Sequence, residues 1–418
     1  MDFSNPEQRR KMILLGGLYI SQYLGISFIF AAVPAILRST GASLQQLSYL
    51  FLLSAIWALK FLWAPLIDRY GSEKYGHYRG WLIVLQSLLI IFMIIASFFD
   101  IETQFWLLFG LFLIISVLSA TQDIAADALG VTILSPEERG IGNSIQGAGT
   151  ALGGLIGGGL ALMTFEWLGW TASMLVLAAG TAIPLINILM YEEKPAPSDQ
   201  REEKVGLRDV VGYFRRPGIG RWLVVLLTYS LGIGMMYNLI NPMLVDIGWS
   251  LDQIGFTLNV VGILFTMAGA GLAGWLVQKL GRKNTMLGGN AFVGVAILLL
   301  LPLASGSSNQ FFIYLAVAMM LFAFGANVTI LSTMMMDKSD PASAGTDFTV
   351  QYCIGTVFAI IAGGAALAVA ETIQYTGVLW ISVGAVLLSL FIVWRYNDFA
   401  PINYDDPVGS DQLSVAGD

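Results

Sequence analysis

The sequence predicts an all-α integral membrane protein with twelve transmembrane helices in two six-helix repeats. Hydrophobic residues make up 56% of the 418 residues, and charged residues make up only 12%. A soluble domain carries about 25% charged residues, so this chain has too little polar surface to cover a globule in water. Apolar runs of about 20 residues, long enough to cross a bilayer as helices, recur along the chain and argue against a β-barrel.

The apolar runs define the expected spans and domains. The spans cover residues 12–37, 44–67, 78–99, 104–134, 138–164, 168–191, 219–245, 251–278, 284–304, 309–336, 343–370 and 375–396. The first run is long enough to span and is expected to be an uncleaved targeting segment. The expected domains are an N-terminal bundle (1–191), a cytosolic linker (192–218), a C-terminal bundle (219–396) and a disordered, acidic cytosolic tail (397–418).

Basic residues predict the orientation of the chain in the membrane. With both termini in the cytosol, 19 of the 21 Lys and Arg residues fall on the cytosolic side. Arg38 is then alone on the far side, and Lys60 lies within the second span. An excess of Lys and Arg of this kind marks cytoplasmic loops. We therefore expect a multi-pass protein with both ends in the cytosol.

The two halves of the chain repeat each other at three places. Residues 41–46 match 248–253, and both copies carry a Ser followed three residues later by Gln, a pattern that caps helix starts. The other matching pairs are 66–71 with 276–281 and 136–146 with 341–351. The offsets of 207, 210 and 205 residues are close to half the chain length. Two parallel repeats of six spans are the arrangement of a large class of membrane transporters.

The connection at 192–218 contains a candidate surface helix. Within residues 205–216, Val210, Val211 and Phe214 alternate with arginines, which predicts a short amphipathic helix lying on the membrane. A solvated linker without regular structure is an equally simple interpretation.

Two carboxylates inside the fourth span are the main functional signal. Asp123 and Asp127 are four residues apart, so they lie on one face of a helix. A charge at membrane depth costs roughly 2.5–3.5 kcal/mol on insertion scales, and such residues usually have a function. Lys60, about 12 Å above the cytosolic end of the second span, is expected to pair with Asp127 and to leave Asp123 without a basic partner. We expect the three residues to couple proton binding to transport; a structural ion pair between spans 2 and 4 is the alternative.

Charged residues at the cytosolic ends of the spans form a candidate gate. Asp68, Arg69 and Arg79 lie at the ends of spans 2 and 3, and Arg139 follows span 4. A carboxylate such as Asp68 can accept hydrogen bonds from an exposed helix N-terminus or from an Arg, and so stabilise one state of the gate. The second copy of the pattern has Gln278 in place of the acid, so the latch is expected to be asymmetric. A solvated loop that only sets topology is the alternative.

The second half carries almost no charge within its spans. Val328 and Ser332 stand 205 residues after Asp123 and Asp127, so ion handling is expected in the first half and substrate binding mainly in the second. Amides and phenols suit a substrate rich in carbonyls, hydroxyls and rings, although a hydrogen bond between helices is the simpler explanation of any single one. The candidate substrate-binding residues are Tyr19, Gln22, Tyr23, Asn143, Gln146, Tyr237, Asn238, Asn241, Asn259, Asn327, Asp347, Gln351 and Tyr352.

The composition also argues against several kinds of site. One Cys and one His in the whole chain make a disulfide framework, a metal site and a His-based catalytic triad poor interpretations. Gly269, Gly271 and Gly274 match a dinucleotide-binding pattern by letter, but no strand precedes them, and close helix packing explains them. The sequence has no P-loop, so ATP is not the expected energy source. We expect no enzyme activity, no cofactor and no nucleic-acid partner.

Several motifs resemble the major facilitator superfamily. The segment 64–71 is similar to the signature loop between its spans 2 and 3, with a weaker copy at 274–283, although Pro65 and a single Arg beside the Gly depart from the common form. One branch of that superfamily is indicated by the motifs at 60–69, 79–81, 122–128 and 138–140. The branch contains muropeptide permeases (AmpG type), inner-membrane siderophore importers (RhtX/FptX type) and acetyl-CoA transporters.

The resemblance implies a monomeric, secondary active importer in the bacterial cytoplasmic membrane, with a bulky substrate bound between the halves. Asp127-Ala128-Leu129 and the loop at 76–81 look more like the siderophore importers, so a ferric siderophore is the expected substrate and an anhydro-muropeptide the alternative. Proton symport is inferred from the buried acids. A membrane sensor would need a signalling domain, and an intramembrane enzyme would need a catalytic pair at one depth; neither is evident in the sequence.

Overall fold

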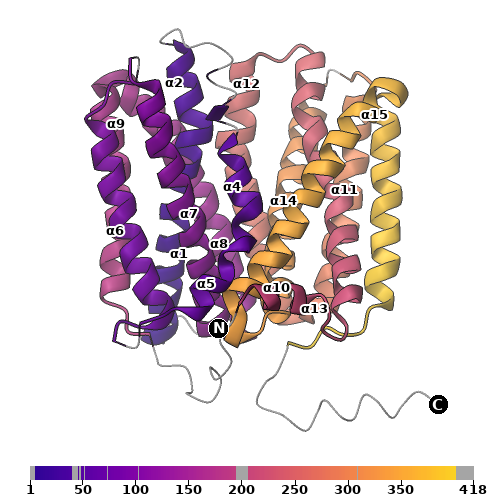
Figure 1. Cartoon of the computed structure of the whole chain (residues 1–418). Coiled ribbons are helices and arrows are strands. Elements are labelled where there is room, and N and C mark those ends of the chain that lie inside the picture. Colours follow the sequence, from indigo (N-terminus) through magenta and orange to yellow (C-terminus); the bar gives the residue numbers. More distant parts are fainter. Residues whose placement is uncertain are drawn as a thin grey trace, which may run out of the picture.

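The computed structural model describes residues 5–39, 46, 49–50, 52–72, 74–101, 103–193, 206–307 and 309–401. The described chain is almost entirely helical, and the two halves of the sequence lie side by side (Figure 1). We call the end of the bundle where α1 begins, α10 lies and α15 ends the termini face.

The first half consists of helices that run between the termini face and the opposite face. Its elements are α1 (Pro6–Ser27), η1 (Phe28–Ala32), α2 (Val33–Ser39), α4 (Ser54–Leu59), η2 (Lys60–Leu62), α5 (Ala64–Arg69), α6 (His77–Ser97), α7 (Phe105–Ile133), α8 (Arg139–Gly154), η3 (Leu155–Leu160) and α9 (Ala161–Leu189). The segments η1 and η3 are π-helical, so α1 continues into α2, and α8 into α9, through a local widening of the helix.

The second half follows a short helix at the termini face. Its elements are α10 (Leu207–Tyr213), α11 (Ile219–Asp246), α12 (Leu251–Phe256), η5 (Thr257–Val261), α13 (Gly262–Ala304), α14 (Gln310–Asp337), η6 (Pro341–Ser343) and α15 (Ala344–Arg395). The helix α10 confirms the predicted surface helix, and Ser250 with Gln253 forms the predicted capping box at the start of α12. The matching Ser43, the linker residues 194–205 and the tail beyond residue 401 lie outside the described residues.

The helices agree with the expected twelve spans. In the described chain, eight helical segments are long and apolar enough to cross a membrane. Three of them contain a residue with a left-handed backbone, at Gly169 (φ 79°), Gly281 (φ 76°) and Gln374 (φ 61°), and therefore hold two consecutive spans each. With the interrupted segment α4–η2–α5, these segments form the two six-helix repeats.

The second span is not the continuous α-helix that the sequence predicts. The 3₁₀ turn η2 separates α4 from α5, and Trp63 (φ −115°, ψ 0°) joins η2 to α5. Pro65 explains the interruption, because proline has no N–H to donate and its ring clashes with the carbonyl group four residues earlier. A 3₁₀ turn rises about 2.0 Å per residue instead of 1.5 Å, so Lys60 lies farther from the termini face than a uniform helix predicts.

Apolar packing holds each half together and then joins the halves. One buried cluster belongs to the first half alone and includes Phe112 and Trp170; another belongs to the second half alone and includes Leu300 and Met320. The third cluster combines residues from both halves, among them Tyr19 and Phe348. The halves are thus packed bundles that share a core towards the termini face.

Candidate functional site

A buried ion pair lies at membrane depth in the first half. The ammonium group of Lys60, in η2, binds the carboxylate of Asp123, on α7. Gln22, on α1, donates its side-chain amide to the other oxygen of the same carboxylate. Lys60 is 0% exposed and Asp123 is 4% exposed, so both charges are removed from bulk water. Three helical segments of the first half therefore meet at Asp123.

Asp127 forms the second part of the same cluster, one turn along α7. Its Oδ1 accepts hydrogen bonds from the Tyr19 hydroxyl (2.9 Å) and from the Gln146 side-chain amide (3.0 Å). Tyr19 comes from α1 and Gln146 from α8. Both donors are neutral, so Asp127 has hydrogen bonds but no ion-pair partner in direct contact.

The expected pairing of Lys60 with Asp127 is wrong. Lys60 binds Asp123, the residue that was expected to lack a basic partner. The 3₁₀ turn at residues 60–62 adds only about 1.5 Å to the second span, so the flexible four-carbon side chain of Lys60 supplies most of the reach to Asp123. We call Gln22, Lys60, Asp123 and Asp127 with Tyr19 and Gln146 the buried acidic cluster.

The buried acidic cluster faces the second half through aromatic side chains. The Lys60 ammonium lies 4.5 Å from the ring centroid of Tyr352, on α15, and 5.1 Å from that of Trp57, on α4. A cation over an aromatic face at this distance is attracted by the ring. Tyr23 is a neighbour of Tyr352, and both side chains are partly exposed. The charged groups are thus buried behind aromatic residues at the interface between the halves.

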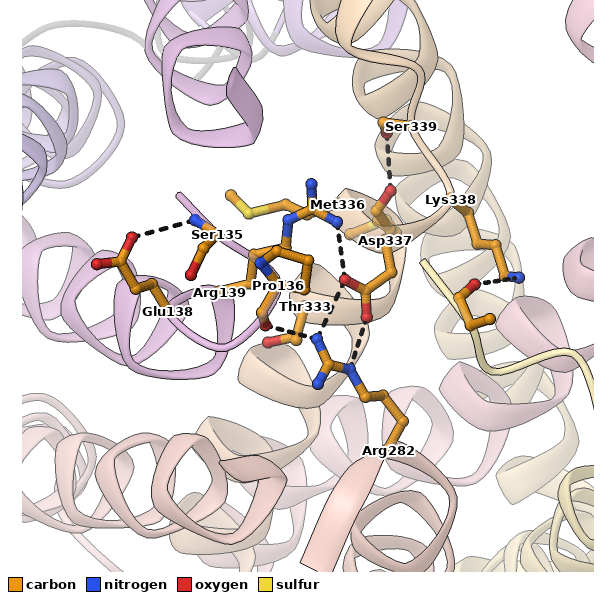
Figure 2. Close-up of polar contacts among 12 residues, drawn as sticks. Ser135, Pro136, Glu138, Arg139, Arg282, Thr333, Met336, Asp337, Lys338 and Ser339 are labelled. Carbon is orange, nitrogen blue, oxygen red and sulfur yellow. Dashed lines mark hydrogen bonds and ion pairs between the residues drawn. The ribbon is translucent and has the colours of Figure 1, made fainter. Parts of the chain in front are cut away.

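A second ionic cluster joins the halves at the termini face (Figure 2). The carboxylate of Asp337, at the end of α14, accepts from Arg139 at the start of α8 (2.9 Å) and from Arg282 on α13 (2.9 Å). Arg282 also donates to the carbonyl oxygen of Pro136 (2.6 Å). Asp337 is 0% exposed. Two guanidinium groups, one from each half, therefore share one buried carboxylate.

Asp68 connects the halves at a neighbouring point of the same face. Its carboxylate accepts from the backbone N–H groups of Gly345 (2.9 Å) and Thr346 (2.7 Å) and from the Thr346 hydroxyl (2.6 Å). Tyr78 donates its hydroxyl to the same carboxylate at 2.9 Å. A carboxylate of the first half thus caps the N-terminus of α15 in the second half, where the helix dipole favours negative charge. The predicted contact with a helix N-terminus is present; its role in gating stays a prediction.

Two residues of the predicted gate make other contacts. Arg79 donates to the backbone carbonyls of Ile188 (3.0 Å) and Leu189 (2.8 Å), so it joins the start of α6 to the end of α9 within the first half. Arg69 is exposed, and its guanidinium lies over the ring of the adjacent Tyr70. Their contacts support the packing of the first half and not a direct link between the halves.

Some of the predicted substrate-binding residues are occupied by helix contacts near the termini face. Gln351 accepts from the Trp222 indole (2.6 Å) and donates to the Ser339 hydroxyl (3.1 Å). Asp347 binds Arg216, which follows α10. Asn143 donates to the Arg139 carbonyl (2.8 Å) on its own helix. For these three residues the simpler interpretation, hydrogen bonding within and between helices, is the one observed.

The remaining substrate-binding candidates of the second half make fewer contacts with other helices. Tyr237 stacks on Phe324 with ring centroids 4.5 Å apart. Asn238 and Asn241 are exposed, and Asn238 donates to a carbonyl of its own helix. Asn327 is 3% exposed, and its side-chain nitrogen has no hydrogen-bond partner in the described structure. The side chain of Asn259 lies outside the described part of the chain.

Sequence reasoning missed Asp337 and the pairing role of Arg282. Asp337 falls one residue after the expected end of span 10, so it was assigned to a loop. Two arginines could have indicated a buried acid at this face. Arg282 lies in the second copy of the signature loop, and Arg139 lies at the start of span 5, on the same side of the membrane. Among the described residues, no group of three or more His, Cys, Asp or Glu side chains is placed to hold a metal ion.

The comparison with protein families decides what kind of protein carries these clusters. The model described as Major Facilitator Superfamily matches residues 15–347, with a second match at 222–416. The chain belongs to the major facilitator superfamily. It is therefore a multi-pass membrane transporter of small molecules, and its family consists of transporters rather than enzymes.

Two curated relatives of this transporter carry related names. The anhydromuropeptide permease of Escherichia coli (strain K12) is 33% identical over 288 residues, which are 67% of this chain and 58% of the permease. The putative transporter AmpG 3 of Rickettsia typhi (strain Wilmington) is 24% identical over 372 residues, covering 84% of this chain and 88% of that protein. The chain thus matches 58% of the length of the Escherichia coli permease.

Solved structures confirm the fold of the transporter. The human organic anion transporter MFSD10 superposes with a TM-score of 0.70 at 18% identity, over 93% of this chain and 100% of that chain. The proton:xylose symporter XylE gives a TM-score of 0.67 at 14% identity, over 93% and 95%. At this identity the likeness shows the shared fold alone.

The comparisons correct the expected substrate. The named relatives support the alternative, an anhydro-muropeptide, better than a ferric siderophore. The structure explains why the loop at 76–81 did not discriminate between them. His77 contacts the Ile67 carbonyl at 2.9 Å and Arg79 binds the end of α9, so this loop holds helix ends in place.

Proposed function

We propose that this transporter imports an anhydro-muropeptide across the bacterial cytoplasmic membrane in symport with protons. The observation that carries the proposal is the buried acidic cluster, in which Lys60 pairs with Asp123 while neighbouring Asp127 accepts hydrogen bonds from Tyr19 and Gln146. The named relatives support the substrate class.

The charge balance of the cluster supports proton coupling. The Lys60 ammonium neutralises Asp123, and Asp127 is held by neutral donors only. A second negative charge in a buried site is costly unless it is paired or protonated. Asp127 can therefore take up a proton when the site closes, and Asp123 can do so when a substrate group draws Lys60 away.

The partly exposed rim of the cluster suits the proposed substrate. Anhydro-muropeptides present sugar hydroxyls, peptide amides and carboxylates. Tyr23, Gln146 and Tyr352 offer hydroxyl and amide groups at the rim, and the Gln146 side-chain oxygen has no hydrogen-bond partner in the described structure. Lys60 lies directly behind Tyr352 and is the cation that a substrate carboxylate can reach after a small rearrangement.

The contacts between the halves support alternating access by a rocking motion. Asp68, Arg139 and Asp337 hold the halves together at the termini face. Substrate is then expected to reach the cluster from the opposite face, and release requires these contacts to break. We assign gating to Asp68, Arg139, Arg282 and Asp337.

The test is uptake into proteoliposomes under an imposed pH gradient, with labelled anhydro-muropeptide and labelled ferric siderophore supplied in separate assays. We expect uphill accumulation of the muropeptide, abolished by a protonophore and by Asp123→Asn. Glu166→Gln is the control, because it changes an exposed acid beside the break at Gly169, away from both ionic clusters, and should leave uptake intact. Accumulation of the siderophore alone would overturn the substrate, and unaltered accumulation by Asp123→Asn would overturn the coupling.

We also propose that the termini face is cytosolic and that the monomer is the working unit. The excess of Lys and Arg at that face supports the orientation. Reporter fusions at residues 193 and 307, on opposite faces, should be active on opposite sides of the membrane. The transporter can be reconstituted at one copy and at several copies per vesicle. Equal uptake per amount of protein in the two preparations would support the monomer as the working unit.

A further inference from the structure

An apolar groove lies next to the buried acidic cluster, on the other side of Cys353 and Trp57. It has a volume of about 370 Å³ and is lined by apolar side chains, including Ala58 and Phe61 of the first half and Phe214, Leu227, Val357 and Phe358 of the linker helix and second half. The groove therefore crosses the boundary between the halves.

The groove follows α15 away from the termini face for about one leaflet of the membrane. On α15 its lining runs from Val350 to Ile361, which corresponds to about 16 Å at 1.5 Å per residue. Half of a typical hydrocarbon core is about 15 Å thick. An acyl chain of one leaflet matches both the length and the apolar lining of the groove.

The end of the groove at the termini face is covered by α10, which carries Arg208 and Asp209 and is followed by Arg215 and Arg216. Val210 and Phe214 line the groove, and Phe214 is 48% exposed. Arg208, on the same helix, and Arg215, which follows it, are exposed at the termini face. Arginine binds phosphate oxygens with two parallel hydrogen bonds, and basic residues beside a membrane attract anionic lipids.

We propose that this groove binds one anionic phospholipid, with an acyl chain between α4 and α15 and the phosphate at Arg208 and Arg215. The apolar lining selects the chain, and the two exposed arginines select the charge of the headgroup. The neighbouring Arg216 already binds Asp347, so it is not assigned to the lipid.

The groove shares a wall with the buried acidic cluster. Cys353 lines the groove, and its thiol lies 3.6 Å from the carbonyl oxygen of Trp57. The Trp57 ring in turn lies 5.1 Å from the Lys60 ammonium. A bound acyl chain therefore contacts residues of both halves next to the cluster, and it stabilises the arrangement in which α4 and α15 are together.

The direct test is native mass spectrometry of the purified transporter in detergent with equimolar phosphatidylglycerol and phosphatidylethanolamine. We expect the wild type to retain one phosphatidylglycerol. Val357→Trp fills the groove and should reduce retention about tenfold, while Leu388→Trp, at another exposed position of α15, should not. Retention by Val357→Trp at the wild-type level, or equal retention of both lipids by the wild type, would overturn the proposal.

A second test leaves the groove unchanged and removes the charges. Arg208→Gln with Arg215→Gln alters exposed side chains only and should abolish the preference for phosphatidylglycerol. Cys353, the only cysteine of the chain, reports on the groove: phosphatidylglycerol should slow its alkylation by N-ethylmaleimide several-fold in the wild type and not in the double variant. Identical protection in both proteins would contradict the headgroup site. Neither test depends on which substrate is transported.

Discussion

The two ionic clusters of this transporter differ in how they use the two halves. In the buried acidic cluster, Lys60 and Asp123 both belong to the first half, and the second half contributes the aromatic ring of Tyr352. In the cluster at the termini face, Asp337 of the second half binds a guanidinium from each half. A rocking motion can therefore leave the first cluster intact while it breaks the second, which suits one cluster to ion binding and the other to gating.

The same asymmetry is visible at equivalent positions of the repeats. Asp123 and Asp127 on α7 correspond to Val328 and Ser332 on α14, and Val328 is 40% exposed. An exposed valine adds apolar surface where the first half has a buried charge. This difference fits the predicted division, in which the first half handles ions and the second binds substrate, and that division stays a prediction.

The largest effect is expected from removing the cation of the buried acidic cluster. Lys60→Met leaves two carboxylates without their cation, and breaking a buried ion pair costs roughly 3–5 kcal/mol. That cost lowers the amount of folded transporter. Separately, each folded copy lacks the charge that neutralises Asp123, so uptake in proteoliposomes, corrected for folded protein, should fall to background. The double variant Lys60→Met with Asp123→Asn should recover thermal stability without recovering uptake. Wild-type uptake by Lys60→Met would remove the cluster from the mechanism.

A smaller, conformational effect is expected at the termini face. Asp337→Asn weakens two charge-assisted hydrogen bonds, each of which contributes about 1.5–3 kcal/mol. The face should open more often, so that a cysteine replacing Ser144 between α8 and α13 reacts faster with a water-soluble maleimide. Cys353→Ser is the background, and Glu166→Gln, at an exposed acid away from the termini face, is the acid control. An unchanged rate would show that the shared carboxylate does not hold the halves together.

Asp68 should have a weaker effect of the same kind. Asp68→Asn keeps an acceptor for the N–H groups of Gly345 and Thr346 but removes the charge at the N-terminus of α15, an interaction of about 0.3–1 kcal/mol. Asp68→Ala also removes the acceptor and should cost about 1 kcal/mol more. In the Ser144→Cys assay, the rate of maleimide labelling should increase from the protein with Asp68 to Asp68→Asn and then to Asp68→Ala. An inverted order would mean that capping is not what Asp68 contributes.

The smallest effect is expected from the exposed amides of α11. Asn238→Ala removes a side chain that bonds only to its own helix among the described contacts, and exposed substitutions usually stay within about 0.5 kcal/mol, or roughly twofold. The concentration dependence of muropeptide uptake measures this directly. A KM raised tenfold or more would instead place Asn238 in contact with substrate and shift recognition towards the second half.

Much of the fold follows from the sequence. Apolar run lengths predict the spans, and the capping box at Ser250 and the surface helix α10 are both present where local patterns predict them. These features are determined by residues a few positions apart in the chain, so they can be predicted from the local sequence. The exact domain boundaries stay predictions.

The partners of the charged residues could not be read from the sequence. Helix rise gave the depth of Asp123 and Asp127, but the reach of the long Lys60 side chain, which decides the ion pair, depends on how the helices pack. Asp337 lay one residue beyond an expected span, and only the packing of α8 against α13 and α14 brings two arginines to it. The sequence predicted Gln351 as a substrate ligand because it does not show the hydrogen bond from Trp222, which forms between helices that are distant in the chain.

The crossing of α8 and α13 limits how the halves can move. A Cβ atom on Gly274 would lie 2.3 Å from the Gly140 carbonyl oxygen, so the backbones touch with no side chain between them. Backbones this close leave little room for sliding, because neighbouring side chains would collide, but they can still rotate about the contact. Gly140 and Gly274 therefore mark a close-packed contact between the halves, and one added methyl group at either residue would force α8 and α13 apart.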